Sequence, residues 1–344
     1  MLLQKIHQNI IKNPNKIAVI DGSNKCTYKE LFSKTLKICS MIKKINKRKN
    51  IKNLVSLENS IELVCIFLAN LILKNKIIPI DYSMKSVEIK NNFKNIKIDL
   101  IITNSYNKTI LNKILNKECL VIGNLAKTKI KYSKTDISER LKNNQDFEFI
   151  VSSSSGTSGN PKKIVLTEKI KLNRAINCIN TYNIKKSYNN LICTPLHHTL
   201  AQRIMFVSLI NGSTFFIENF SPLNFLNIIR KKKINFSMMV SLQLQKVFSL
   251  DNIKKSDFKT LKCLVSSSES LDVKLKRKII NEFKINLHEI YGLSEAGTLT
   301  NLNISKYQNK ILSVGKPIDQ TVIKIINKNN GIGEITFKSP RIFK

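Results

Sequence analysis

The chain has 344 residues, of which 42% are hydrophobic, and this size predicts a globular protein with a large core and more than one subdomain. Its formal net charge of +35 would ordinarily suggest nucleic acid or an anionic membrane as a partner. The excess is mostly lysine, however, and it is spread along a chain rich in asparagine and isoleucine, which indicates a compositional bias more than a binding patch.

The cysteines and the apolar segments favour a cytoplasmic protein. The seven cysteines form no CxxC pair and are odd in number, which argues against a disulfide framework or a zinc site. The N-terminus lacks the apolar stretch of a signal peptide. The longest apolar segment, at 61–73, is short and contains Glu62 and Asn70, so we expect a buried helix and no membrane span.

Strands alternate with helices in the first part of the chain. Residues 27–45 have apolar side chains at helical spacing, with Thr27 as N-cap and Glu30 completing a capping box. Further expected elements are strands at 53–59, 76–81 and 98–104 and a helix at 60–75. This alternation predicts a parallel sheet with crossover helices.

The same pattern continues in the second part. Strands are expected at 189–196, 213–219, 235–240, 261–270 and 286–292, and helices at 199–212, 221–233 and 273–283. Residues 321–339 then predict two strands joined by a turn at Asn329, Asn330 and Gly331. We therefore expect an α/β fold of layered mixed sheets, with α/β subdomains at about 1–150 and 151–300 and a partial β-rich subdomain at 301–344.

The segment between expected strands at 150–151 and 163–167 reads "SSSSGTSGNPK". It joins two strands, whereas the common phosphate motifs GxGxxG and GxxxxGK[ST], both absent, need the start of a helix. Its glycines would still let backbone N–H groups approach an anion, and its hydroxyls and Lys162 would add donors and charge. The segment alone leaves two interpretations open, a phosphate-binding loop and a mobile surface turn.

Several motifs, in order along nearly the whole chain, resemble those of the AMP-forming adenylate-forming enzymes. This family includes acyl-CoA synthetases, adenylation domains of nonribosomal peptide synthetases and luciferases. The most specific matches are "SSGTSGNPK" at 154–162, which resembles the family's phosphate loop, and "YGLSEAG" at 291–297, which resembles its YGxTE motif. Further similar segments are "TYKEL" at 27–31, "IIPID" at 77–81, "PLHH" at 195–198, "LVSSSESL" at 264–271, "VGKPI" at 314–318 and "GIGEI" at 331–335.

The resemblance implies a role for each matched residue. The β- and γ-phosphates of ATP would be held by Ser154, Ser155, Gly156, Thr157, Ser158, Gly159 and Lys162. The adenine pocket would be formed by Ser267, Ser268, Glu269, Tyr291 and Gly292. Glu295 would hold Mg²⁺ and Ser294 would bond the α-phosphate, while His198 would lie where the acyl group meets the phosphate. The expected catalytic residues are His198, Ser294, Glu295 and Lys162.

Each of these residues also has a plain structural interpretation. Glu295 could be a surface carboxylate, Tyr291 a core residue and Ser266–Ser268 a turn. His197 and His198 could be a polar strand end, and no cysteine or carboxylate stands near them at metal-ligand spacing. The order of the motifs favours the functional interpretation.

The sequence also departs from the family pattern. Lys163 replaces the glycine that closes the phosphate loop, which costs about 1 kcal/mol if that position needs positive φ. Ser267 and Ser268 replace two glycines at the adenine wall, and Asn75 replaces another glycine. The family continues into a TGD segment and a small lid domain that this sequence does not contain, so weak turnover is expected unless a separate chain supplies the lid.

The resemblance implies an AMP-forming acid–thiol ligase that adenylates a carboxylic acid with ATP and Mg²⁺. The thiol acceptor would be coenzyme A or the phosphopantetheine arm of a carrier protein. An acyl or aryl acid is favoured, because the segment 199–212 has no acidic residue to hold an ammonium group. The alternatives are an amino-acid-adenylating protein, a shortened non-catalytic nucleotide- or partner-binding homologue and, from charge alone, a nucleic-acid-binding protein.

Overall fold

The structure is a computed structural model that describes residues 1–93, 96–123, 134–142, 145–153 and 163–343. Its larger sheet contains β1 (Ile17–Asp21), β2 (Asn24–Thr27), β9 (Asn189–Ile192), β10 (Thr214–Ile217), β11 (Phe236–Val240), β12 (Cys263–Ser267), β13 (Leu287–Leu293), β14 (Gly297–Asn303) and β15 (Lys316–Pro317). The order across this nine-stranded sheet is β15-β14-β13-β12-β11-β9-β10-β1-β2. The neighbours from β13 through β12, β11, β9 and β10 to β1 are parallel.

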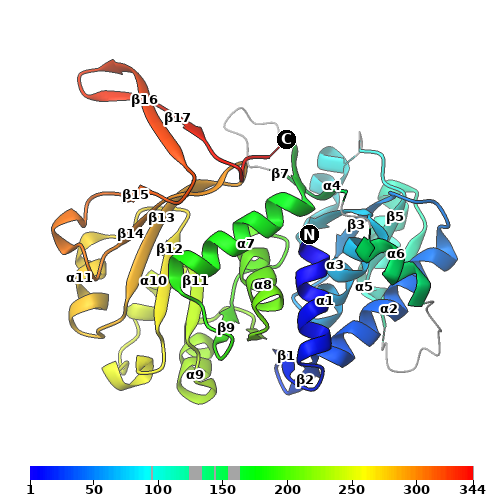
Figure 1. The fold of residues 1–344 in the computed structure, drawn as a ribbon, viewed down its shortest axis with the longest axis horizontal. Helices are drawn as coiled ribbons and strands as arrows, with labels where there is room; N and C mark the ends of the chain where they lie inside the picture. The colour runs from blue at the N-terminus through cyan, green and yellow to red at the C-terminus, as the bar shows by residue number, and fades with distance from the viewer. Residues whose placement is uncertain (94–95, 124–133, 143–144, 154–162, 344) are drawn as a thin grey trace.

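A second sheet of six strands lies on the other side of the molecule (Figure 1). It contains β3 (Lys52–Ser56), β4 (Lys76–Ile80), β5 (Leu100–Thr103), β6 (Cys119–Val121), β7 (Glu148–Ser153) and β8 (Lys163–Thr167). The order is β6-β5-β3-β4-β7-β8, and every pair is parallel except β7 with β8. The expected pair of strands that brackets residues 154–162 is thereby confirmed.

Helices fill the space between the sheets and cover their outer faces. They are α1 (Leu2–Lys12), α2 (Tyr28–Ile45), α3 (Ile61–Leu73), α4 (Ser86–Phe93), α5 (Ser105–Leu115), α6 (Lys134–Lys142), α7 (Glu168–Tyr182), α8 (Thr199–Asn211), α9 (Pro222–Lys232), α10 (Ser241–Phe248) and α11 (Val273–Asn281), with 3₁₀ turns at Lys255–Phe258 and Gln308–Lys310. Figure 1 shows α7 and α8 running between the two sheets. The layered α/β fold with crossover helices is therefore confirmed.

Successive residues of the central strands point into different cores, as the period of two in a strand requires. In β12, Leu264 belongs to the outer core under α9, α10 and α11, whereas its neighbour Val265 belongs to the core between the sheets. In β3, Leu54 packs with α4 and α5, and Val55 faces the central core. This burial on both faces explains why these strands read as continuous apolar runs.

Local sequence signals predicted several element ends correctly. At the start of α2, Thr27 accepts a hydrogen bond from the Glu30 amide at 3.2 Å, and the Glu30 carboxylate accepts one from the Thr27 amide at 2.8 Å. This is the capping box expected there. The helix α3 has 13 residues and is buried almost all round. Among the described residues, no helix combines the length and the apolar content needed to cross a membrane.

The hairpin of β16 (Val322–Asn329) and β17 (Ile332–Lys338) extends away from both sheets (Figure 1). Asn330 and Gly331 have φ of 47° and 81°, as a tight turn between two strands requires, so the expected hairpin is confirmed. The division of the chain near residues 150 and 300 stays a prediction. β1 and β2, from the first of those ranges, pair into the nine-stranded sheet beside β10.

Candidate active site

In the two sheets, the carboxyl ends of the parallel strands β3 and β9 lie close to each other. Asn59, in the turn after β3, donates to the Thr194 carbonyl at 3.0 Å, and its side-chain oxygen accepts from the Leu196 amide at 2.7 Å. Thr194 and Leu196 lie in the loop after β9, so Asn59 ties the end of one sheet to the end of the other. In α/β folds, ligands bind at such carboxyl ends.

The two histidines of the PLHH segment form the turn before α8, and His198 is the N-cap residue of that helix. Their ring centroids are 4.1 Å apart. Burial and the neighbouring His198 lower the pKa of His197 to about 4, while Asp81, at the end of β4, acts in the opposite direction. Burial also lowers the pKa of His198. Both rings are therefore neutral at pH 7.

The histidine turn rests on a buried amide and a buried lysine. Gln202 of α8 donates to the carbonyl oxygens of Leu196 and His197 at 3.0 and 3.2 Å. Its own oxygen accepts from the Lys171 ammonium group at 2.7 Å, and that group lies 5.5 Å from the centre of the Phe206 ring. Desolvation, followed by nearby arginines, lowers the pKa of Lys171 well below its ordinary value.

The residues predicted for the adenine pocket come together from two adjacent strands. Ser267 ends β12, Ser268 and Glu269 follow it, and Tyr291 and Gly292 lie in β13, which pairs with β12. Ser268 has φ of 80°, a left-handed conformation that favours the glycine it replaces. The Glu269 carbonyl accepts a hydrogen bond from Ser241 at 2.5 Å, which links this segment to the end of β11.

A buried ion pair stabilises the chain directly after Ser268 and Glu269. Glu289 of β13 accepts from the Leu271 amide at 2.8 Å and from the Lys276 ammonium group at 2.6 Å. Lys276 also donates to the Ile311 carbonyl at 3.0 Å. Glu289 and Lys276 are 3% and 2% exposed, so both charges depend on this pairing. The pair fixes the chain just after the predicted adenine wall.

The turn that contains Ser294 and Glu295 joins β13 to β14 and is held by its backbone. Arg174 of α7 donates to the Ser294 carbonyl at 3.0 Å and to the Glu295 carbonyl at 2.8 Å. The Glu295 carbonyl also accepts from the Phe343 amide at 2.9 Å. Gly297 closes the turn with φ of 74°, and a Cβ atom there would lie 3.0 Å from the Arg174 side chain.

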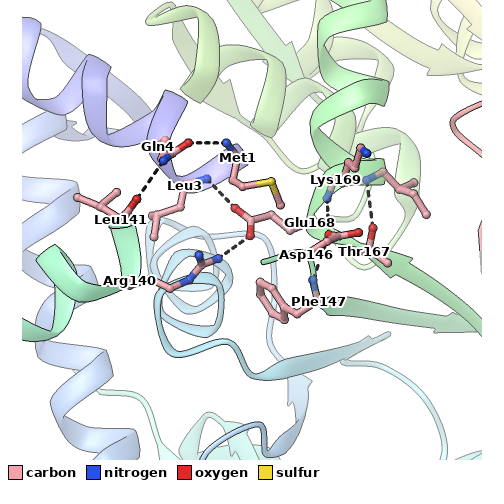
Figure 2. A network of polar contacts seen from close by, with 11 residues as sticks. Met1, Leu3, Gln4, Arg140, Leu141, Asp146, Phe147, Thr167, Glu168 and Lys169 are labelled. Carbon is pink, nitrogen blue, oxygen red and sulfur yellow. Dashed lines mark hydrogen bonds and ion pairs between the residues drawn. The ribbon is translucent and has the colours of Figure 1, made fainter. Parts of the chain in front are cut away.

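The helix that carries Arg174 is anchored at its first residue (Figure 2). Glu168 is fully buried and bonds the Arg140 guanidinium at 2.5 Å and the Leu3 amide at 3.0 Å. Thr167 caps the helix by accepting from the Ile170 amide at 3.2 Å. Because α7 follows β8 directly, this anchor fixes Arg174 relative to the hairpin of β7 and β8.

The predicted phosphate-loop residues Ser154, Ser155, Gly156, Thr157, Ser158, Gly159 and Lys162 lie outside the described part of the chain. Their flanks are described: Ser153 pairs with Lys163 at the tip of the antiparallel pair. Lys163 lies within β8 and is not among the residues with positive φ. The strain considered for a lysine at this glycine position is therefore absent.

Magnesium fits the Glu295 turn on the evidence of the side chain. The Glu295 carboxylate makes no hydrogen bond or ion pair with another described residue, so its oxygens are available to a ligand. The described residues contain no group of three or more His, Cys, Asp or Glu side chains that could enclose a metal ion. One carboxylate completed by substrate phosphates and water is the usual arrangement for Mg²⁺.

Three residues of this site were assigned no role from the sequence. Asn59 and Asp81 follow strands β3 and β4, and the carboxyl-end rule for parallel strands could have pointed to them. Arg174 contacts a turn 120 and 121 positions further along the chain, and nothing local to it indicates that contact.

Comparisons with known proteins agree with this geometry. A family model described as AMP-binding enzyme matches residues 6–344. Gramicidin S synthase 2 from Brevibacillus brevis is 22% identical over 332 residues, which cover 94% of this chain and 7% of that protein. The 2-succinylbenzoate–CoA ligase of Lactococcus lactis subsp. lactis is 22% identical over 290 residues, covering 83% of this chain and 61% of the ligase. The chain thus spans less than two thirds of these relatives.

Solved structures match the fold over the full described length. O-succinylbenzoate coenzyme A synthetase from Bacillus subtilis, in complex with ATP and magnesium ion, superimposes with a TM-score of 0.85 at 20% identity, covering 99% of this chain and 71% of that one. The inhibitor-bound N-terminal domain of FACL13 from Mycobacterium tuberculosis gives a TM-score of 0.83 at 17% identity, covering 100% of this chain and 90% of that one.

Proposed function

The chain belongs to the AMP-binding enzyme family, and from this premise we propose that it is an AMP-forming acid–thiol ligase. It binds ATP with Mg²⁺, adenylates a carboxylic acid and passes the acyl group to a thiol. The observation that carries the proposal is the clamp of Arg174 on the Ser294–Glu295 turn. This clamp connects the turn with the predicted magnesium ligand to the helix that directly follows β8.

In the proposed reaction, a carboxylate oxygen of the acid attacks the α-phosphorus of ATP. The new oxygen–phosphorus bond forms as the bond to pyrophosphate breaks, and the pyrophosphate leaves in line. Positioning and neutralisation of charge provide the rate enhancement in such transfers. When bound, Mg²⁺ would neutralise charge on the phosphate oxygens.

Each of several side chains would take one role in this reaction. Glu295 would hold the metal ion, Ser294 would donate to the α-phosphate, and Lys162 would attract the leaving phosphates. His198 would lie beside the reacting carboxylate, and as a neutral ring it can donate a hydrogen bond without adding charge. Tyr291 would pack against the adenine.

An acyl or aryl acid is the proposed substrate class, with coenzyme A or a carrier's phosphopantetheine as the thiol. Two named relatives are CoA ligases for such acids: the lactococcal 2-succinylbenzoate–CoA ligase and the Bacillus subtilis long-chain-fatty-acid–CoA ligase. Amino-acid adenylation is the second candidate, favoured by the similarity to gramicidin S synthase 2 over 94% of the chain. The residues of α8 include no carboxylate for an ammonium group.

The test is ATP–pyrophosphate exchange by the chain with a panel of monocarboxylic, dicarboxylic, aryl and amino acids. The proposal predicts exchange that is weak without a separate chain supplying the lid and that requires both Mg²⁺ and an acid other than an amino acid. Glu295→Gln should lower the exchange rate at least a hundredfold, whereas Glu282→Gln, on the surface beyond α11, should leave it unchanged. Nucleotide binding without exchange for any acid would instead support a non-catalytic nucleotide-binding homologue. Exchange with amino acids alone would support the second candidate.

A further inference from the structure

Three of the chain's seven arginines converge on one small cavity. Arg174 comes from α7, Arg203 from α8 and Arg341 from the segment after β17. The cavity holds about 10 Å³, which is room for about one water molecule, and its other lining residues are Asn177, Cys178, Thr181, Tyr182 and Thr298. None of the lining residues is acidic. In a chain whose positive charge is mostly lysine, this is a local concentration of guanidinium groups.

Arg203 lies at the electrostatic centre of this arginine cluster. After burial, which is the larger effect, the charge of Arg203 lowers the pKa of Arg174 and that of Arg341. The ordinary pKa of an arginine is so high that Arg174 and Arg341 keep their charge at neutral pH in spite of this lowering. Glu295 acts on Arg174 and Asp319 acts on Arg341 in the opposite direction, but neither carboxylate forms an ion pair with these arginines among the described residues.

The three guanidinium groups differ in how many donors they still have. Arg174 is fully engaged, because its Nε and both Nη atoms bond the carbonyls of Ser294, Glu295 and Arg341. Arg341 uses one terminal nitrogen on Asp319 and Thr321, and its buried Nε has no partner in the described structure.

Arg203 is the least constrained of the three. Within the described part of the chain its side chain bonds only the Thr298 hydroxyl, and it is half-buried. Two of the arginines that line the cavity therefore have unused donors, those of Arg203 and the buried Nε of Arg341, and no lining residue described here offers a negative charge to them. Buried donors without partners are costly, and an anionic group would satisfy them.

The position of the cavity relates it to the proposed reaction. Arg203 lies five residues beyond His198 on α8, about 7.5 Å along the helix axis. Thr298 lies three residues beyond Glu295, at the start of β14. The cavity thus lies between α8, which begins at the histidine turn, and β14, which follows the Glu295 turn.

We propose that the acid activated by this protein is a dicarboxylic acid, whose second carboxylate is bound by Arg203 and the Nε of Arg341. This inference rests on the proposed adenylation function and names the substrate class of that site. Because the cavity has room for about one water molecule, binding of the carboxylate requires the half-buried Arg203 side chain to leave Thr298, and the arginine cluster would repel the ammonium group of an amino acid. A planar guanidinium suits a carboxylate because it presents parallel donors.

The test compares two stable mimics of the acyl-adenylate on the whole chain. In 5′-O-(N-acylsulfamoyl)adenosine a sulfamoyl group replaces the phosphate, and the acyl part is either ω-carboxylated (succinyl, glutaryl or adipoyl) or ends in a methyl group at the same length (butyryl, pentanoyl or hexanoyl). Titration calorimetry should give at least tenfold tighter binding for one of the carboxylated mimics than for its methyl counterpart. Arg203→Met should remove this preference, and Arg277→Met, an exposed arginine on α11, should leave it intact.

The outcomes separate this inference from the proposed function. Equal binding of both mimics, or tighter binding of the methyl mimics, leaves adenylate binding in place and overturns the dicarboxylic substrate. Failure of every mimic to bind overturns the proposed function, and the inference falls with it. A carboxylate preference that survives in Arg203→Met contradicts the assignment to Arg203. The comparison of mimics on the unmodified chain stands even if that variant fails to fold.

Discussion

The guanidinium of Arg174 donates a 2.8 Å hydrogen bond to the backbone carbonyl of Glu295, 121 positions away in the sequence. The same guanidinium holds the carbonyls of Ser294 and Arg341. One buried side chain therefore joins the helix after β8, the turn with the predicted magnesium ligand and the segment after β17. The position of the Glu295 backbone depends on this joint.

Replacing Arg174 by methionine should affect both stability and nucleotide binding. Arg174→Met leaves the carbonyls it bonds without those donors, so the free energy of unfolding should fall by about 2–4 kcal/mol. Arg174→Lys should recover little of it, because an ammonium group cannot span the same carbonyls. Urea unfolding measures the first effect, and calorimetric titration with MgATP should show at least a tenfold loss of affinity. Arg277→Met, at an exposed position, should change neither quantity.

Replacement by glycine should change the free energy of unfolding in opposite directions at two adjacent serines of the predicted adenine pocket. Ser268 has φ of 80°, so Ser268→Gly relieves strain and should raise the free energy of unfolding by about 0.5–1 kcal/mol. Ser267 ends β12 and is not among the residues with positive φ, so Ser267→Gly should lower it by about the same amount. Urea unfolding of the two variants side by side checks this. Equal changes of the same sign would contradict the role of backbone strain.

Much of this fold could be predicted from patterns of residues close together in the sequence. The capping box of Thr27 and Glu30, the apolar run of α3 and the turn at Asn330 and Gly331 involve residues within a few positions of each other, and all were predicted correctly. The parallel arrangement of the sheets follows from the alternation of strands and helices. Short helices such as α4 and α10 were not predicted, because eight residues give little periodicity.

Residues of the site could be predicted from the sequence only where they belong to a motif that resembles the family's. Ser267, Ser268, Glu269 and Tyr291 were placed on neighbouring segments by resemblance, and the pairing of β12 with β13 brings those segments together. The clamp of Arg174, by contrast, depends on contacts between distant segments, which only the folded chain defines. The roles of these residues in binding and catalysis stay predictions.

The buried pair of Lys276 and Glu289 should be strongly coupled. Glu289→Gln can still accept from the Leu271 amide but leaves the Lys276 charge buried and uncompensated, so the free energy of unfolding should fall by about 3–5 kcal/mol. The double variant Lys276→Met/Glu289→Gln should recover a large part of that loss. A double-mutant cycle from urea unfolding measures the coupling. Additive effects of the two single changes would show that the pair does not act as a unit.

Acid should destabilise the protein, because desolvation lowers the folded-state pKa of its histidines and they are forced to take up protons. The folded-state pKa of His197, about 4, is below its unfolded value, so the unfolded state binds more protons at mildly acid pH. Burial lowers the pKa of His7, His198 and His288 in the same direction. The stability is complete above pH 6.5 and is lost as the pH falls towards 4.

Urea midpoints between pH 7.5 and 4.5 measure this dependence. The midpoint should fall continuously below pH 6.5, and the fall should be shallower in His197→Asn, which cannot titrate. A midpoint that stays constant down to pH 5, or a variant with an unchanged slope, would contradict the burial of a neutral His197.

The most direct test of the central claim is the magnesium dependence of ATP binding, measured by calorimetry on the unmodified chain and on Glu295→Gln. If Glu295 holds the metal ion that binds together with ATP, Mg²⁺ should tighten ATP binding by at least tenfold in the unmodified chain and hardly at all in the variant. An equal magnesium effect in both proteins, or no binding of ATP to either, would contradict the account.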